Sequence, residues 1–80
     1  MAKLFVGNLS YEARDSDLQA AFAQHGTVAG ASVPVEAYSR QSRGYGFVDM
    51  PDPDEARSAI EALNGYDLHG QPIVVRVVIP

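Results

Sequence analysis

The stretch "RGYGFVDM", Arg43 to Met50, decides the fold and raises the first question about function. Successive side chains of a β-strand point to opposite faces of a sheet. Tyr45 and Phe47 therefore share one face, and the opposite face takes Gly44, Gly46, Val48 and Met50. Both faces are apolar, and the two rings lie side by side on one of them. The stretch predicts a strand from Gly44 to Met50, and the position of its rings needs an explanation.

The composition fits a single domain of residues 1–80 with one small core, since 46% of the chain is apolar. The net charge of −4, taken alone, argues against a nucleic-acid partner, because phosphate binding depends on Lys and Arg. The chain has no cysteine, which excludes disulfides and thiolate metal sites and fits a reducing compartment, so we expect a cytoplasmic location. No apolar run approaches the length of a membrane span, and no membrane partner is expected.

Three elements are expected before this stretch. A β-prone run predicts a strand from about Lys3 to Asn8, and apolar residues at spacings of three and four predict a helix from about Asp15 to His25. Gly26 follows this helix as its stop residue. A second strand covers about Val28 to Val35. Pro34 lies inside it and places it at an edge of the sheet, because proline cannot donate to a ladder.

Two elements are expected after this stretch. Asp52 suits the N-cap of a helix, Pro53 its first position, and Glu55 stands three residues after the cap. This helix stops at Gly65, and a last strand runs from about Ile73 to Ile79. The resulting order, β-α-β-β-α-β, predicts an α+β fold of the ferredoxin-like class. One physical solution is a four-stranded antiparallel sheet with both helices on one face.

The alternation along the strands defines the expected core. Helices on one face cover only the residues that point toward them, so Tyr45 and Phe47 are expected on an open face. Gly44 and Gly46 fall on the helix side, where a small residue permits close packing. The expected core consists of the strand residues Leu4, Val6, Ala31, Val33, Val48, Met50, Ile73 and Val75 and the helix residues Leu18, Ala21, Phe22, Ala56, Ile60 and Leu63.

The chain resembles the RNA-recognition motif family. "RGYGFVDM" agrees with the family octamer, [K/R]-G-[F/Y]-[G/A]-F-V-x-[F/Y], at seven of eight positions. "LFVGNL", Leu4 to Leu9, resembles the hexamer of the first strand, and "ALNGYDLHGQPI" the connection to the last strand. The resemblance covers Lys3 to about Val77 and implies the strand order 4-1-3-2. Met50 departs from the octamer at a position that points into the core, so the departure concerns packing rather than binding.

The resemblance also implies an RNA-binding site on the open face. Two of the aromatic residues would stack on bases, Tyr45 would pack on a sugar, and Arg43 would pair with a phosphate. Phe5 alternates with Leu4 and Val6, which independently predicts that its ring points to the open face. The expected RNA-binding residues are Phe5, Tyr45 and Phe47 with the basic residues Lys3, Arg40, Arg43 and Arg76.

The position of the charges answers the objection from the acidic total. The four basic residues of the expected site lie on the open face or its bordering loop, and most acids lie on the helices. Four contacts to single-strand phosphates imply a slope of log K against log salt of about −3. Ser32 and Ala37 stand where family members often carry basic residues, and Asp49 lies on the open face. These three residues predict a modest affinity.

The leading hypothesis is a non-catalytic, monomeric module that binds single-stranded RNA or single-stranded DNA. The alternative is a protein–protein interaction module that uses the same face or the last strand, where Val74, Val77 and Val78 are expected to make the outer side apolar as well. An enzyme is not expected, because the sequence carries no cofactor motif and no recognisable catalytic group. A metal site is not expected either, because His25 and His69 are far apart and no cysteine is present.

Overall fold

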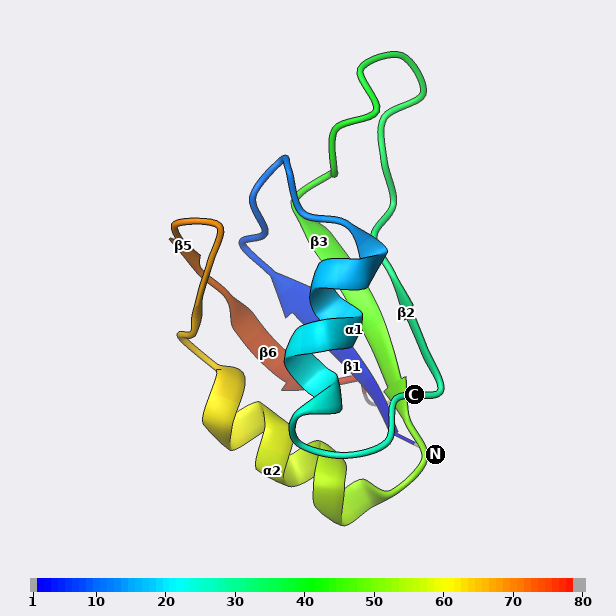
Figure 1. The fold of residues 1–80 in the computed structure, drawn as a ribbon, viewed down its shortest axis with the longest axis vertical. Coiled ribbons are helices and arrows are strands. Elements are labelled where there is room, and N and C mark those ends of the chain that lie inside the picture. The colour runs from blue at the N-terminus through cyan, green and yellow to red at the C-terminus, as the bar shows by residue number, and fades with distance from the viewer. Residues whose placement is uncertain (1, 79–80) are drawn as a thin grey trace.

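The computed structural model describes residues 2–78 and confirms the predicted architecture (Figure 1). Four strands form one antiparallel sheet in the order β2-β3-β1-β6, which is the predicted order 4-1-3-2, and both helices cover the same face of it. A separate hairpin pairs β4 with β5. The elements are β1 (Ala2–Gly7), α1 (Asp15–Ala23), β2 (Gly30–Ser32), β3 (Tyr45–Met50), α2 (Pro53–Leu63), β4 (Asp67–Leu68), β5 (Gln71–Pro72) and β6 (Val74–Val77).

The core lies between the sheet and the two helices, as predicted. Phe22 of α1 is its largest fully buried side chain, and Met50 of β3 is also fully buried. Gly46 faces the helices, and a Cβ atom there would lie 2.8 Å from the Ser32 carbonyl oxygen and 2.9 Å from Cδ1 of Leu18. The absence of a side chain at Gly46 therefore lets α1 pack closely against β3. Of the predicted core, all residues are buried except Ala31 and Ile60, which pack against it half-buried.

The second strand is shorter than predicted, and Pro34 lies outside it. β2 covers only Gly30–Ser32, although it does form an edge of the sheet. The backbone N–H of Val33 donates to the carboxylate of Asp15 in α1 at 2.7 Å rather than to a strand. The pairing of β2 with β3 therefore ends at Ser32, because the next N–H, that of Val33, donates to α1, and Pro34 follows it.

The ends of the other strands and of the first helix also differ from the prediction: β1 covers Ala2–Gly7 instead of Lys3–Asn8, and β3 begins at Tyr45 instead of Gly44. α1 ends at Ala23, and the two residues to His25 form a turn in which the His25 N–H donates to the Phe22 carbonyl. β6 begins at Val74, because the Ile73 N–H donates to Tyr66 instead of to β1. Ile79, the predicted end of the last strand, lies outside the described residues.

The hairpin of β4 and β5 was not predicted as strands. Its turn consists of His69 and Gly70, which both have positive φ angles, 53° and 83°. Two consecutive residues of this kind are typical of the tight turns that join antiparallel strands. The dipeptide His-Gly is a weak sequence signal for such a turn, and the two strands have only two residues each, too few for periodicity to reveal.

The second helix begins as predicted. Its N-cap is Asp52, whose carboxylate accepts hydrogen bonds from the N–H groups of Asp54 and Glu55 at 2.8 and 3.4 Å. Pro53 occupies the first helical position, where its missing N–H costs no hydrogen bond. Neither helix of residues 2–78 is long and apolar enough to cross a membrane, and the cytoplasmic location stays a prediction.

Candidate nucleic-acid interface

Three rings meet on the open face of the sheet, and we call Phe5, Tyr45 and Phe47 the aromatic cluster. Phe5 lies directly opposite Phe47 in the pairing of β1 with β3. The ring centroids of these two residues are 5.9 Å apart, those of Phe5 and Tyr45 6.2 Å, and those of Tyr45 and Phe47 5.9 Å. The predicted adjacency of the three rings is therefore present.

The rings are not coplanar, so the aromatic cluster is not one flat surface. Phe5 and Tyr45 are nearly parallel, with 18° between their planes, whereas Phe47 meets them edge-on at 68° and 80°. Gly7 stands opposite Tyr45 in the register, and a Cβ atom on it would lie 2.9 Å from the Phe5 ring. A side chain at Gly7 would push Phe5 away, so this glycine allows the Phe5 ring its position beside Tyr45.

Two cations of the predicted site lie beside the aromatic cluster. The Lys3 ammonium is 5.0 Å from the centroid of Phe47, and the Arg76 guanidinium carbon is 6.0 Å from that of Phe5. Both distances are within the range of cation–π attraction. Asp49 stands opposite Lys3 in the register and adds a carboxylate to the same face. The open face therefore has more positive than negative charge, although the whole chain is acidic.

The third predicted cation, Arg43, is already paired. Its guanidinium Nε lies 3.3 Å from a carboxylate oxygen of Glu36, and both side chains remain about half exposed. Arg43 is two residues before Tyr45, and its backbone N–H donates to the Pro34 carbonyl at 3.0 Å. The sequence prediction placed Arg43 at the edge of the site but missed its acidic partner.

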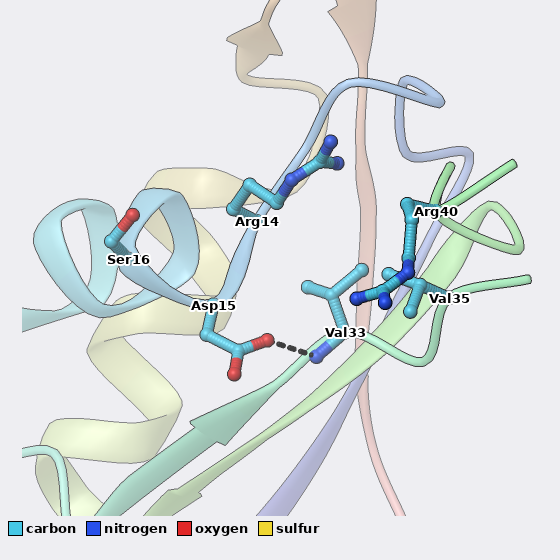
Figure 2. Close-up of a pocket in the computed structure, with 6 residues that line it drawn as sticks. All are labelled: Arg14, Asp15, Ser16, Val33, Val35 and Arg40. Carbon is cyan, nitrogen blue, oxygen red and sulfur yellow. Dashed lines mark hydrogen bonds between the residues drawn. The ribbon is translucent and has the colours of Figure 1, made fainter. Parts of the chain in front are cut away.

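The fourth predicted cation, Arg40, is not part of the aromatic cluster. It lies at the far end of the loop between β2 and β3, and its side chain extends beside Val33 and Val35 (Figure 2). Together with Arg14 and the first residues of α1, it lines a cleft of about 480 Å³. The structure therefore brings Lys3 and Arg76 to the rings, and places Arg40 over the start of the first helix.

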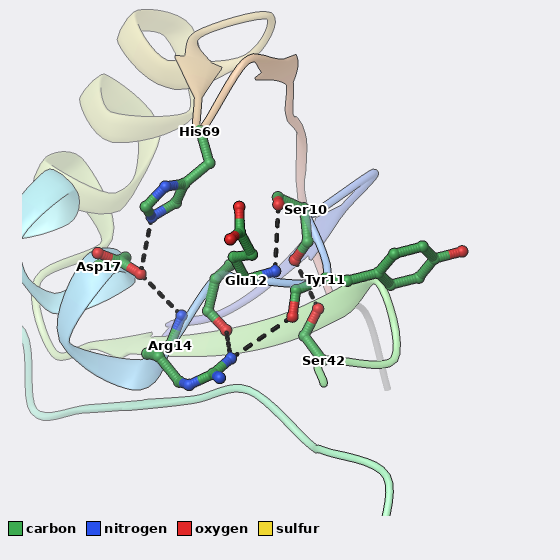
Figure 3. A network of polar contacts seen from close by, with 8 residues as sticks. Ser10, Tyr11, Glu12, Arg14, Asp17, Ser42 and His69 are labelled. Carbon is green, nitrogen blue, oxygen red and sulfur yellow. Dashed lines mark hydrogen bonds and ion pairs between the residues drawn. The ribbon is translucent and has the colours of Figure 1, made fainter. Parts of the chain in front are cut away.

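A buried serine, Ser42, fixes the end of the β2–β3 loop that carries Arg43. Ser42 is 2% exposed, and its hydroxyl donates to the Ser10 carbonyl at 2.6 Å (Figure 3). The Ser42 N–H donates to the carbonyl of Tyr11, and the Leu9 N–H donates to the carbonyl of Gly44. These bonds join the segment after β1 to the segment before β3. Sequence reasoning missed this role, because a lone serine before the octamer carries no pattern.

The β4–β5 hairpin is tied to the same end of the sheet. The side chain of Asn8 donates to the Pro72 carbonyl at 2.7 Å, and the side chain of Gln71 donates to the Asn8 carbonyl at 3.1 Å. On its other side, the imidazole Nε2 of His69 lies 3.0 Å from the Asp17 carboxylate in α1 (Figure 3). The same carboxylate accepts a hydrogen bond from the Arg14 N–H at 2.8 Å. Asp17 therefore joins the start of α1 to the hairpin.

These contacts shift the ionisation of Asp17. Partial burial by itself raises the pKa of this carboxyl. The hydrogen bond from the Arg14 backbone and the contact with His69 outweigh that effect and hold the pKa of Asp17 below its ordinary value. A lowered pKa in the folded state contributes stability that is present above the unfolded pKa, about 3.9, and is lost as the pH falls through the folded value.

Replacing Asp17 with asparagine is therefore expected to destabilise the protein near neutral pH and not in acid. We expect a loss of about 0.5–1 kcal/mol in the free energy of unfolding at pH 7, the range of a partly exposed charge contact. The difference between the two proteins should shrink as the pH falls below the unfolded pKa of about 3.9 and approach zero only below the lowered pKa of the folded protein. Urea denaturation followed by circular dichroism, at pH 7 and at a series of acidic pH values, measures this difference. His69→Gln removes one of the two contacts of Asp17 and should therefore lose less stability at pH 7 than Asp17→Asn. If Asp17→Asn were as destabilising in acid as at pH 7, this account would be wrong.

Val77 does not lie on the open face, contrary to the prediction. It stands opposite the buried Leu4 in the register and therefore points toward the helices. There it lines an apolar cleft of about 300 Å³ with Ile60 and other residues of α2. The prediction counted it among the outward residues without following the alternation of the strand. Val74 and Val78 do flank Arg76 on the open face, and they are 40% and 38% exposed.

The titratable side chains of residues 2–78 form no group of three or more that could hold a metal ion. The contact of His69 with Asp17 is a single pair, and no other carboxylate or imidazole forms an ion pair with it in this part of the chain. The charged side chains beside the aromatic cluster are instead the cations Lys3 and Arg76, which suit contacts with anions, and the carboxylate of Asp49.

Comparison with known proteins assigns the family. The family model of the RNA recognition motif matches residues 4–74. The RbpA protein of Nostoc sp. (strain PCC 7120 / SAG 25.82 / UTEX 2576) is 42% identical over 77 residues, which cover 96% of this chain and 76% of RbpA. The crystal structure of RNA binding protein PG1 is similar with a TM-score of 0.91 and 36% identity, over 100% of this chain and 96% of that one.

A chain in the SXL-lethal protein/RNA complex is similar with a TM-score of 0.86 and 31% identity, over 95% of this chain and 47% of that one. The agreement thus holds at the level of both the motif and the whole fold, since the family model covers most of the chain. The predicted resemblance is confirmed: this chain belongs to the RNA recognition motif family.

Proposed function

We propose that this protein binds single-stranded RNA, without catalysis, on the open face of its sheet. The observation that carries the proposal is the aromatic cluster itself: three rings in mutual contact on the face of the sheet opposite the two helices, with Lys3 and Arg76 beside them. Bases of a single strand stack on such rings, whereas the bases of a duplex are already stacked and paired. Membership of the RNA recognition motif family and the RNA-bound structural neighbour support this function.

Each group of the face has a distinct role in the proposed complex. Phe5 and Phe47 stack on bases, and the steep angle between their planes means that two bases would lie at an angle to each other. Tyr45 packs on a sugar between them. Lys3 and Arg76 move from their positions over the rings to phosphates, because a base and a cation compete for the same ring face.

The test is an NMR titration of the isotope-labelled protein with a pool of short random single-stranded RNA. Shifts centred on Phe5, Tyr45 and Phe47 are expected, and they should weaken as salt rises. The same titration with single-stranded DNA of matched length measures the contribution of the 2′-hydroxyl. A spectrum that stays unchanged at high RNA concentration would reject the proposal.

The salt dependence of RNA binding is expected to be shallower than the sequence suggested. Arg40 lies away from the aromatic cluster, so three phosphate contacts remain, by Lys3, Arg43 and Arg76. The slope of log K against log salt should then be about −2, and Arg76→Ala should reduce its size by about 0.7. Fluorescence anisotropy over a range of salt concentrations measures both values.

Arg57 offers a matched control for this measurement. It carries the same charge on α2, on the covered side of the sheet, and contacts Asp54. Arg57→Ala should leave the slope unchanged. A slope that falls equally in both variants would show that the total charge, rather than contacts at the face, governs binding.

A protein partner on the same face is the second candidate. Val74 and Val78 extend the apolar surface beyond the rings, on the exposed side of an edge strand. Association through apolar side chains does not weaken with rising salt, whereas phosphate contacts do. The salt titration therefore also separates this candidate from RNA binding.

A further inference from the structure

The loop between β2 and β3 places Glu36 and Arg43 together by its backbone pairing. Val35 and Ser42 form an antiparallel bridge, flanked by hydrogen bonds from the Glu36 N–H to Gln41 and from the Arg43 N–H to Pro34. Glu36 and Arg43 then project from the same side of this narrow hairpin as diagonal neighbours, within reach of long side chains. Ser42 points to the other side, where its hydroxyl is buried against Ser10. The ion pair of Glu36 with Arg43 is therefore built into the loop.

The carboxylate of Glu36 takes the place on Arg43 that an RNA phosphate would occupy. A carboxylate and a phosphate both present oxygen atoms to the guanidinium, and the Nε–Oε1 distance of 3.3 Å is that of a direct contact. The hydrogen bonds that hold Glu36 in the loop use its backbone N–H and C=O, to Gln41 and Arg40. Within the described residues, the contact with Arg43 is the one ion pair of this carboxylate.

We propose that Glu36 is an internal competitor for Arg43 and so sets the affinity of the protein for RNA. Binding exchanges the carboxylate of Glu36 for a phosphate on the Arg43 guanidinium. Both side chains are about half exposed, so the pair is weak enough to exchange. This inference rests on the proposed function and adds Glu36 as a residue that weakens RNA binding.

The test compares Glu36→Gln with Glu61→Gln in RNA binding. Glutamine keeps the size and the backbone contacts of Glu36 and removes its charge. Glu61 is an exposed residue of α2 on the covered side of the sheet, so its variant controls for the change in total charge. At low salt, Glu36→Gln should bind single-stranded RNA about two- to fivefold more tightly than the unmodified protein, which is the range of an exposed ion pair. Glu61→Gln should bind RNA with the affinity of the unmodified protein. The gain should vanish at about 0.5 M salt, where screening weakens the pair.

A double-variant cycle shows whether the effect acts through Arg43. In the Arg43→Ala background, Glu36→Gln should change RNA affinity no further. Equal effects of Glu36→Gln and Glu61→Gln, no effect of either, or a gain that persists without Arg43 would overturn the inference. In each of these cases the proposed function stands if the unmodified protein binds RNA and Phe47→Ala binds it more weakly. No binding by the unmodified protein rejects both.

Discussion

Replacing Phe47 with alanine is expected to weaken the binding of short single-stranded RNA by about 5- to 150-fold. Stacking of a base on an aromatic side chain contributes about 1–3 kcal/mol by alanine substitution, and each 1.36 kcal/mol corresponds to a factor of ten. Phe47 is the ring that meets both others edge-on and has Lys3 above it, so its loss also removes contacts at the centre of the aromatic cluster. Fluorescence anisotropy with a labelled oligonucleotide measures the change.

The fold should survive this substitution, because the Phe47 ring projects to the open face and not into the core. Circular dichroism and the thermal midpoint check it. Tyr66→Ala is a matched control: Tyr66 is 46% exposed and lies outside the sheet, between α2 and β4, so its variant should bind RNA as the unmodified protein does. If Phe47→Ala binds RNA with full affinity, the nucleic acid lies elsewhere on the protein.

Replacing Phe22 with alanine is expected to cost about 3–5 kcal/mol in the free energy of unfolding. Phe22 is the largest fully buried side chain and lies on the face of α1 that meets the sheet. Small domains have only about 5–15 kcal/mol of stability in all, so this variant would be close to unfolding at room temperature. Urea denaturation followed by circular dichroism measures the loss.

A smaller substitution at the same site keeps this prediction measurable if the alanine variant does not fold. Phe22→Leu removes fewer atoms and should lose less stability than Phe22→Ala, because the size of the cavity sets part of the cost. Its RNA affinity, measured where the protein is fully folded, should equal that of the unmodified protein. A loss below about 1 kcal/mol for Phe22→Ala would show that the neighbouring side chains close around the site.

The sequence predicts best where a local pattern repeats. The alternation in "RGYGFVDM" placed Tyr45 and Phe47 on one face and Gly46, Val48 and Met50 in the core, and the burial along β3 follows it residue by residue. Asp52 and Pro53 likewise marked the start of α2. Strand alternation and helix capping depend on residues a few positions apart, so they can be read without knowing the rest of the fold.

The prediction was incomplete or wrong where distant segments compete for one group. Val33 gives its N–H to Asp15 of α1, which shortens the second strand, and Ile73 gives its N–H to Tyr66, which delays the last one. The β2–β3 loop places Arg40 at a cleft beside the start of α1 rather than beside the rings. Asp15 is 18 residues from Val33 and Tyr66 is seven from Ile73, both beyond the few positions over which strand alternation and helix capping act.

The sequence by itself therefore determined the order of the two helices and of the four strands of the main sheet, the face of each core residue and the identity of the rings in the aromatic cluster. Only the tertiary structure decided which charges meet: Lys3 and Arg76 with the rings, Glu36 with Arg43, and His69 with Asp17. The physical reason lies in what each kind of interaction needs. Burial depends on how side chains alternate along a strand or helix, which the order of apolar and polar residues in the sequence reveals. The pairing of long charged side chains depends on which loops the whole fold brings together.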